Sequence, residues 1–168
     1  ELNFPAIALT DNSNLFGLIK FYRLAREKGI KPIVGSEITL VGGESIAPAP
    51  IVLLVKNKKG YTNLTRLVSK AYIEGQMNGE PLVKIEWLKE FSDGLIALSG
   101  GQKGHIGQAL LSNSISKAKK TIDFFSRIFE EDFFIEIQRV GRENEEEYNY
   151  LALNLALDKD VAVVATND

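Results

Sequence analysis

Short apolar runs alternate with amphipathic stretches along most of the chain. The apolar runs, many rich in β-branched residues, predict buried strands at residues 6–9, 33–38, 51–55, 94–99, 133–137 and 161–165. Stretches with apolar residues at helical spacing predict helices at residues 15–28, 59–75, 85–91, 106–111, 114–129 and 143–159. Strands that alternate with helices predict a parallel α/β architecture, either doubly wound or closed into a barrel.

Two segments interrupt this pattern. Residues 41–49 contain glycine and proline and predict a loop, and residues 76–83 predict a polar connection. The sequence shows no internal repeat, low-complexity tract or interdomain linker. Its 168 residues therefore predict a single domain, and a chain of this size buries roughly 70% of its unfolded surface.

The first strand–helix–strand unit carries an acidic residue at the end of each strand. Asp11 follows the first strand, and Glu37 lies near the end of the second. Ligands of α/β proteins gather at the carboxyl ends of the strands, so both residues are candidates for a site. A structural interpretation stays open, because residues 10–13 also supply N-caps for the following helix and Glu37 can be a solvated strand end.

This unit resembles a known family. The segment ALTDNSNLFGLIKFYRLAREKGIKPIVGSE is similar to the PHP (polymerase and histidinol phosphatase) domain at the start of bacterial DNA polymerase III alpha subunits. The resemblance continues through LVKNKKGYTNLTRLVSKAY, GLIALSGGQKGHIGQALL, DFFIEIQRVGR and VAVVATND. It implies an α/β fold of the PHP type, a distorted β/α barrel that is seven-stranded in the family.

The resemblance also implies that residues 1–168 are most of a PHP domain excised from a much longer replicative polymerase chain. The first strand of the family's barrel, which carries an H-x-H motif, would lie before Glu1 and is lacking here. A missing strand leaves unpaired backbone edges beside residues 6–9. We therefore expect this chain to self-associate or to have a rearranged barrel.

Composition and charge narrow the functional classes. Apolar residues make up 45% of the chain and charged residues 25%, as in ordinary globular domains. The net charge of −2 disfavours strong binding of DNA by this domain itself. The absence of cysteine excludes disulfides and thiolate metal sites. No apolar run is long enough to span a bilayer, and no signal peptide is visible, so we expect a cytoplasmic protein without a membrane partner.

The metal site of the family can be compared position by position. Active members hold metal ions at the strand ends through histidine, aspartate and glutamate, and such ions hydrolyse phosphoesters. Asp11, Glu37 and Asp168 match acidic ligand positions of the family. At three further positions, Asn12 and Val140 stand where active forms carry histidine, and Gly101 where they carry cysteine. The resemblance therefore predicts a degenerate site with no catalytic residue and no bound metal, although Mg²⁺ or Mn²⁺ could bind weakly if the site is partly retained.

Other candidate residues favour ordinary structural roles. His105, the only histidine, is not in a ligand motif of the family and is predicted to be a surface or capping residue. Gly100 and Gly101 could cradle an anion before a helix, but tight-turn chemistry is favoured. Arg139 and Arg142 could bind phosphate, and pairing with the acidic residues 143–147 is favoured.

The resemblance implies a function for the whole polypeptide. A polymerase III alpha subunit is a DNA-directed DNA polymerase that uses Mg²⁺ and contacts DNA, and its partners are the proofreading exonuclease and other holoenzyme subunits. For this domain the first hypothesis is a catalytically silent, structural role that docks the exonuclease. The alternatives are an active metal-dependent phosphoesterase, acting as a 3′–5′ exonuclease or pyrophosphatase, and a small-molecule phosphatase of the histidinol-phosphate kind.

Overall fold

The computed structural model describes residues 4–42 and 46–167 of the chain. One curved sheet has the strand order β4-β5-β2-β3-β6-β7-β8, and β1 pairs with β2 beside it. The strands are β1 (Ala6–Leu9), β2 (Lys31–Gly42), β3 (Ile46–Val55), β4 (Gln76–Met77), β5 (Glu80–Lys84), β6 (Leu95–Leu98), β7 (Phe133–Gln138) and β8 (Val163–Thr166). The α-helices are α1 (Leu18–Glu27), α2 (Lys58–Glu74), α3 (Ile85–Phe91), α4 (His105–Leu111), α5 (Ile115–Phe129) and α6 (Glu145–Lys159).

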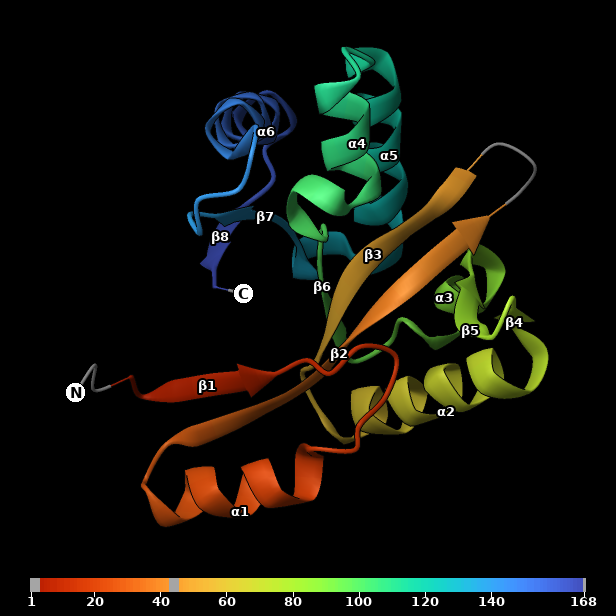
Figure 1. Ribbon diagram of the computed structural model, residues 1–168, viewed down its shortest axis with the longest axis vertical. Coiled ribbons are helices and arrows are strands. Elements are labelled where there is room, and N and C mark those ends of the chain that lie inside the picture. The colour runs from red at the N-terminus through yellow and green to blue at the C-terminus, as the bar shows by residue number, and fades with distance from the viewer. Residues whose placement is uncertain (1–3, 43–45, 168) are drawn as a thin grey trace.

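The predicted strand–helix–strand unit at the start of the chain is confirmed. β1 pairs in parallel with the first residues of β2, from Ala6 opposite Lys31 to Leu9 opposite Val34. Helix α1 packs across these two strands on one side of the molecule (Figure 1). Gly29, at a φ of 72°, reverses the chain between α1 and β2, which is the left-handed conformation that glycine adopts most easily.

The predicted parallel architecture holds for most strand pairs, but it is wrong at the centre of the sheet. Strand β2 pairs antiparallel with β3, and β3 pairs antiparallel with β6. The predicted loop at residues 41–49 is also too long, because β2 continues to Gly42 and β3 begins at Ile46; residues 43–45 lie outside the described residues. No helix separates β2 from β3, and only a crossover connection can join parallel neighbours.

The prediction of a polar connection at residues 76–83 is wrong as well. Strands β4 and β5 form a hairpin there, and β5 then pairs in parallel with the end of β2. Asn78 and Gly79 join the two strands with φ angles of 55° and 85°, the conformation of a two-residue hairpin turn. Leu82 and Val83 of β5 are buried. The Asn-Gly dipeptide was the sequence signal for this hairpin.

The sheet curls but does not close in the described part of the chain. Strands β6, β7 and β8 run parallel to one another, and β8 pairs there only with β7. Strand β1 likewise pairs there only with β2. Both edges lie toward the same side of the molecule in Figure 1. An incompletely closed, distorted β/α barrel therefore describes this sheet, and self-association through its edges stays a prediction.

Helices cover the sheet in two groups (Figure 1). Helix α2 packs against β2, β3 and β5, and α3 packs beside it. Helices α4, α5 and α6 pack together over β6 and β7. One continuous core joins both groups, and its largest fully buried side chains include Ile38, Leu40, Ile51, Leu53, Leu64, Leu67, Leu88, Leu95, Ile106, Leu110, Ile122 and Tyr148. Within the residues that the structure describes, no helix is long and apolar enough to cross a membrane.

Candidate functional site

Asp11 and Glu37 lie side by side just past the end of β1, but the prediction that Glu37 lies near the end of its strand is wrong, because β2 continues to Gly42 and places Glu37 in its middle. Past the end of β1, Asn12 forms an isolated parallel bridge with Glu37 of β2. The Glu37 N–H donates to the Asp11 carbonyl at 3.2 Å, and the Ser13 N–H donates to the Glu37 carbonyl at 2.7 Å. Parallel pairing thus brings Asp11 and Asn12, which follow β1, beside Glu37 in the middle of β2.

The carboxylate of Asp11 binds backbone. Its Oδ2 accepts a hydrogen bond from the Gly17 N–H at 2.9 Å. Gly17 is the N-cap residue of α1, so the helix begins later than the predicted caps at residues 10–13. The structural interpretation of Asp11 is nevertheless supported, since this carboxylate fixes the turn that leads into the helix.

Glu136 of β7 also belongs to this site, although it was not among the residues predicted from the sequence. Its side chain is buried, and its Oε1 accepts hydrogen bonds from the Thr166 hydroxyl and from Gln138 Nε2, the latter at 3.2 Å. The Glu136 N–H donates to Ser99 Oγ at 2.9 Å, and the Tyr148 hydroxyl donates to the Glu136 carbonyl at 2.6 Å. The sequence does indicate Glu136, because it is the one charged residue in the apolar strand β7. An ionised side chain is rarely buried without partners, so such a residue predicts a polar site.

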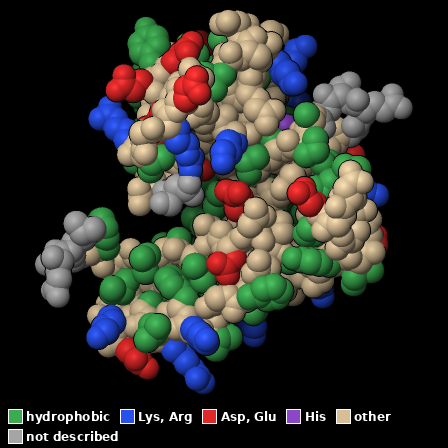
Figure 2. All heavy atoms as spheres, in the orientation of Figure 1, with side chains coloured by type: hydrophobic (Ala, Val, Ile, Leu, Met, Phe, Trp, Pro, Cys, Tyr) green, Lys and Arg blue, Asp and Glu red, His purple; other side chains and the backbone are tan. Residues whose placement is uncertain are grey.

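Both acidic and basic side chains act on the pKa of the Glu37 carboxyl. Burial raises the pKa of Glu37 above its ordinary value of 4.5, and the nearby Glu136 carboxylate raises this pKa further. The cations of Lys103 and Arg142 act in the opposite direction on Glu37. Arg142 also donates through Nη1 to Gln138 Oε1 at 2.7 Å, so a chain of polar contacts leads from Arg142 to Glu136. Figure 2 shows acidic and basic side chains close together in the middle of this face.

Gly100 and Gly101 form a left-handed turn between β6 and α4, with φ angles of 77° and 56°. The Gly104 N–H donates back to the carbonyls of Gly100 and Gly101 at 2.9 and 3.2 Å. A Cβ built on Gly101 would lie 3.9 Å from the Gln138 side chain, which places Gly101 opposite the polar contacts of β7. The tight-turn interpretation accounts for both glycines, and anion binding by them stays a prediction.

Val140 lies in the loop between β7 and α6, and 37% of its surface is exposed. The Glu145 carboxylate accepts hydrogen bonds from the Val140 N–H at 2.8 Å and from the Gly141 N–H at 2.9 Å. These backbone donors, and Arg142 beside them, hold the pKa of Glu145 below its ordinary value. Arg142 therefore lies near one of the acidic residues with which it was predicted to pair, namely Glu145. For Arg139, no acidic partner is seen in the described ranges 4–42 and 46–167.

His105 is buried, so the prediction of a surface position is wrong. It is the first residue of α4, and its Nε2 lies 3.1 Å from the Ala47 carbonyl of β3. Its ring packs at a tilt against Phe125, with the ring centres 6.4 Å apart. The contacts tie α4 to β3, and His105 contributes to packing away from the acidic strand ends.

Stability should fall on mild acidification because of His105. Burial lowers the pKa of His105 beneath its ordinary 6.5, against a smaller opposing effect of the Ala47 hydrogen bond. The unfolded chain therefore takes up a proton near pH 6.5 that the folded chain resists, and this contribution to stability is lost as the pH falls through that value. Urea midpoints measured from pH 7.5 to 5.5 should decline less for His105→Gln than for the unaltered chain. Equal declines would contradict this role.

The described residues do not fit a metal cluster. No group of three or more histidine, aspartate or glutamate side chains in residues 4–42 and 46–167 is arranged to hold an ion. The Asp11 carboxylate accepts a backbone N–H, Glu136 accepts two donors, and two cations act on Glu37. These contacts leave one oxygen free on the Asp11 and Glu136 carboxylates, so the misfit rests on the lack of a third ligand beside them among the described residues and on the two cations near Glu37. Asp168, the remaining predicted ligand position, lies outside the described residues.

Comparisons with known proteins show the family to which the chain belongs. A family model for the PHP domain matches residues 1–140. The DNA polymerase III alpha subunit of Vibrio cholerae is 44% identical over 168 residues, that of Pseudomonas aeruginosa 45% over 168, and that of Escherichia coli K12 41% over 171. Each alignment covers 99% of this chain, which spans 14% of the length of each relative.

A solved structure shows the same fold. It is described as a candidate metal-dependent phosphoesterase from Bifidobacterium adolescentis, and it superposes with a TM-score of 0.57 at 12% sequence identity. The superposition covers 98% of this chain and 77% of the other. At this identity the likeness supports a PHP-type α/β architecture and carries no argument about activity.

Proposed function

The chain belongs to the PHP domain family, and we propose that it is the PHP region of a replicative DNA polymerase III alpha subunit. In this proposal the domain is catalytically silent, supports the polymerase and docks the proofreading exonuclease subunit. Its similarity to named alpha subunits, at 41–45% identity over 99% of the chain, supports the assignment to that polypeptide. The polymerase activity, its Mg²⁺, its DNA and a cytoplasmic location belong to the same proposal for the whole protein.

The observation that carries the silent role is the state of the carboxylates at the strand ends. Asp11 and Glu136 accept hydrogen bonds from protein donors, and Glu37 lies under the influence of Lys103 and Arg142. Protein cations near Glu37 supply positive charge that a metal ion would supply in an active site. We therefore infer that this domain holds no tightly bound metal and hydrolyses no phosphoester.

The second candidate function is a metal-dependent phosphoesterase of the PHP kind. Asp11 and Glu37 do lie together at one edge of the sheet, which is the arrangement such an enzyme uses. When bound, a metal ion would acidify a water and polarise a phosphoryl oxygen. This function would use Asp11 Oδ1, since Oδ2 accepts the Gly17 N–H, and it would require a metal ion to compete with Lys103 and Arg142 for Glu37.

Substitutions at Asp11 separate the two functions. Asp11→Ala should lower stability by about 1 kcal/mol, the usual worth of a side-chain acceptor at a helix start. Asp11→Asn should recover most of this loss, because the amide oxygen still accepts the Gly17 N–H. Urea unfolding measures stability, and release of phosphate from a nucleotide or phosphoester with added Mn²⁺ measures activity.

We expect no release from the unaltered full-length subunit or from either variant. Release by the unaltered protein that Asp11→Ala abolishes and Asp11→Asn reduces would establish the phosphoesterase, since alanine removes the ligand oxygen and asparagine removes its charge. The docking role has its own test, binding of the purified exonuclease subunit to the full-length alpha subunit. Failure to bind would remove that role from the proposal.

A further inference from the structure

Positive charge is concentrated on helix α1 and the turn that follows it. Residues 18–31 contain five cationic side chains and one carboxylate, so this segment has a net charge of +4, whereas the rest of the chain carries −6. All five cations are exposed, and together they form the basic patch: Lys20, Arg23, Arg26, Lys28 and Lys31. The overall charge of −2 therefore conceals a local surface with the electrostatic character that polyanions require.

The cations of the basic patch are not neutralised by the protein. None of the five takes part in an ion pair among the residues that the structure describes. Elsewhere the chain does pair its lysines, as where Lys56 lies 2.7 Å from Asp132. Arg23 and Glu27 are four residues apart on α1, a spacing that allows pairing, yet no ion pair joins these two described residues. The charges of the patch are thus available to a ligand.

Three lysines of α1 and α2 occupy positions that helix electrostatics disfavour. Lys20 lies in the first turn of α1, and Lys58 and Lys59 lie in the first turn of α2. Neither turn contains an acidic residue. The positive end of the helix dipole repels cations and favours carboxylates, so these lysines do not serve helix stability. Residues that break a local rule without a structural gain are expected at functional surfaces.

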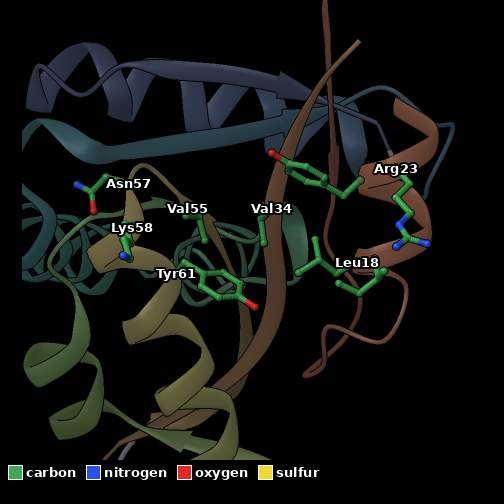
Figure 3. Close-up of a pocket in the computed structure, with 9 residues that line it drawn as sticks. Leu18, Arg23, Val34, Val55, Asn57, Lys58 and Tyr61 are labelled. Atoms are coloured by element: carbon green, nitrogen blue, oxygen red, sulfur yellow. The ribbon is translucent and has the colours of Figure 1, made fainter. Parts of the chain in front are cut away.

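Aromatic side chains adjoin the basic patch. A hollow of about 530 Å³ lies between α1 and α2, and Tyr22 of one helix and Tyr61 of the other line it (Figure 3). Arg23 and Lys58 stand on opposite sides of this hollow. Around α1, Figure 2 shows basic and hydrophobic side chains intermixed on the surface. Cations on both sides of an aromatic surface suit a strand of nucleotides, in which phosphates alternate with flat bases.

A membrane surface fits α1 less well. A helix that lies on a bilayer places its exposed apolar side chains on one face. Ile19 and Tyr22 line the hollow toward α2. Leu24, which is 58% exposed, follows Tyr22 by two residues and so lies on nearly the opposite side of the helix. The exposed apolar side chains of α1 therefore do not share the single face that a bilayer would require.

We propose that the basic patch binds single-stranded DNA through its phosphates, with Lys58 contacting the strand across the hollow and Tyr22 stacking on a base. A nucleic acid is favoured over an acidic protein because it carries a regular series of negative charges and also offers bases to the aromatic side chains. A single strand is favoured over a duplex because its bases are free to stack on a side chain. The choice of DNA rests on the proposed assignment to a polymerase.

The test measures binding of the full-length alpha subunit to a fluorescent oligothymidylate over a series of salt concentrations. The patch variant neutralises three cations of α1 and combines Lys20→Gln, Arg23→Gln and Arg26→Gln. A second variant, Tyr22→Leu, removes the stacking surface and keeps an apolar side chain. Unchanged urea midpoints exclude misfolding of both variants.

A matched control removes the same number of charges from α5, which belongs to the other group of helices (Figure 1). It combines Lys117→Gln, Lys120→Gln and Arg127→Gln. These three residues are exposed, and none of them forms an ion pair in the part of the chain that the structure describes. A DNA duplex of the same length and vesicles that contain phosphatidylserine serve as alternative probes.

We expect the patch variant to reduce the steepness of the plot of log K against log salt concentration by about 2, since each phosphate contact of a single strand contributes about 0.7. Its affinity should fall at least about tenfold at low salt. Tyr22→Leu should weaken binding about fivefold or more and leave the salt dependence unchanged, because stacking neutralises no phosphate. The control should bind like the unaltered protein. No binding of the oligothymidylate, or equal losses in the patch variant and the control, would overturn the proposal.

The alternative probes separate the classes of ligand. A loss confined to the single strand supports the proposal. An equal loss for the duplex, a loss seen only with vesicles, or a loss seen only with the purified exonuclease subunit overturns it in favour of that ligand. Primer extension by the unaltered protein tests the assignment to a polymerase separately. If extension fails while the patch variant still weakens binding of the oligothymidylate, the single-strand site stands and only the choice of DNA is removed.

Discussion

Replacing Gly100 with alanine is expected to destabilise the domain by about 2–5 kcal/mol, a large share of the stability of a typical domain. A left-handed backbone costs a residue with a side chain roughly 1–2 kcal/mol, and Gly100 has a φ of 77°. The new Cβ would also lie 2.1 Å from the Pro50 carbonyl oxygen, and relieving such a clash costs about 1–3 kcal/mol. Urea unfolding of the purified chain measures the loss.

Gly101 is the matched control for this prediction. It lies in the same turn with a φ of 56°, but the nearest atoms to its Cβ would be those of Gln138 at 3.9 Å. Gly101→Ala should therefore cost only the backbone strain of about 1–2 kcal/mol. Equal losses for the two variants would show that the approach to Pro50 does not constrain Gly100.

The second large effect is expected at Leu67 of α2. Its side chain is fully buried between α2 and the sheet, and Leu67→Ala should cost about 2–5 kcal/mol through lost burial and a cavity. Ile73→Ala, in the same helix, removes a side chain that is 79% exposed and should change stability by less than about 0.5 kcal/mol. Thermal and urea unfolding of both variants measure the difference. Equal losses for the two variants would contradict the burial of Leu67 and the exposure of Ile73 in this fold.

The sequence predicted the strand–helix–strand unit well because its signals are local. Apolar runs of strand length and the glycine at the end of α1 determine that unit. The antiparallel pairing of β2 with β3 depends on which segments meet in space, and short apolar runs carry no direction. The β4–β5 hairpin was not predicted although Asn78 and Gly79 are a typical hairpin turn. The two strands are short and contain polar residues, so they lack the apolar alternation that indicates a strand.

The site was predicted in part. The proximity of Asp11 and Glu37 follows from the parallel pairing of β1 with β2, whereas the continuation of β2 to Gly42, which places Glu37 in mid-strand, was not predicted. Glu136 was not selected, and its burial depends on Thr166 and Gln138, which lie far apart in the sequence. The exposure of Ile19 could not be read from helical spacing, since spacing shows that a helix has an apolar face and does not show what covers it.

One physical feature supports the proposed silent role. The carboxylates of Asp11 and Glu136 accept hydrogen bonds from protein donors, and Glu37 lies near two cations. We propose that the fold is retained without a metal centre and that the domain hydrolyses no phosphoester.

The most direct test of this account is the metal content of the full-length subunit, purified without chelator and measured by elemental analysis. The account predicts zinc, manganese and iron far below one ion per chain, with no change in Asp11→Asn or Glu37→Gln. Near-stoichiometric metal that both substitutions remove would contradict it. That result would mean that these carboxylates form a working metal site, and the phosphoesterase would become the favoured function.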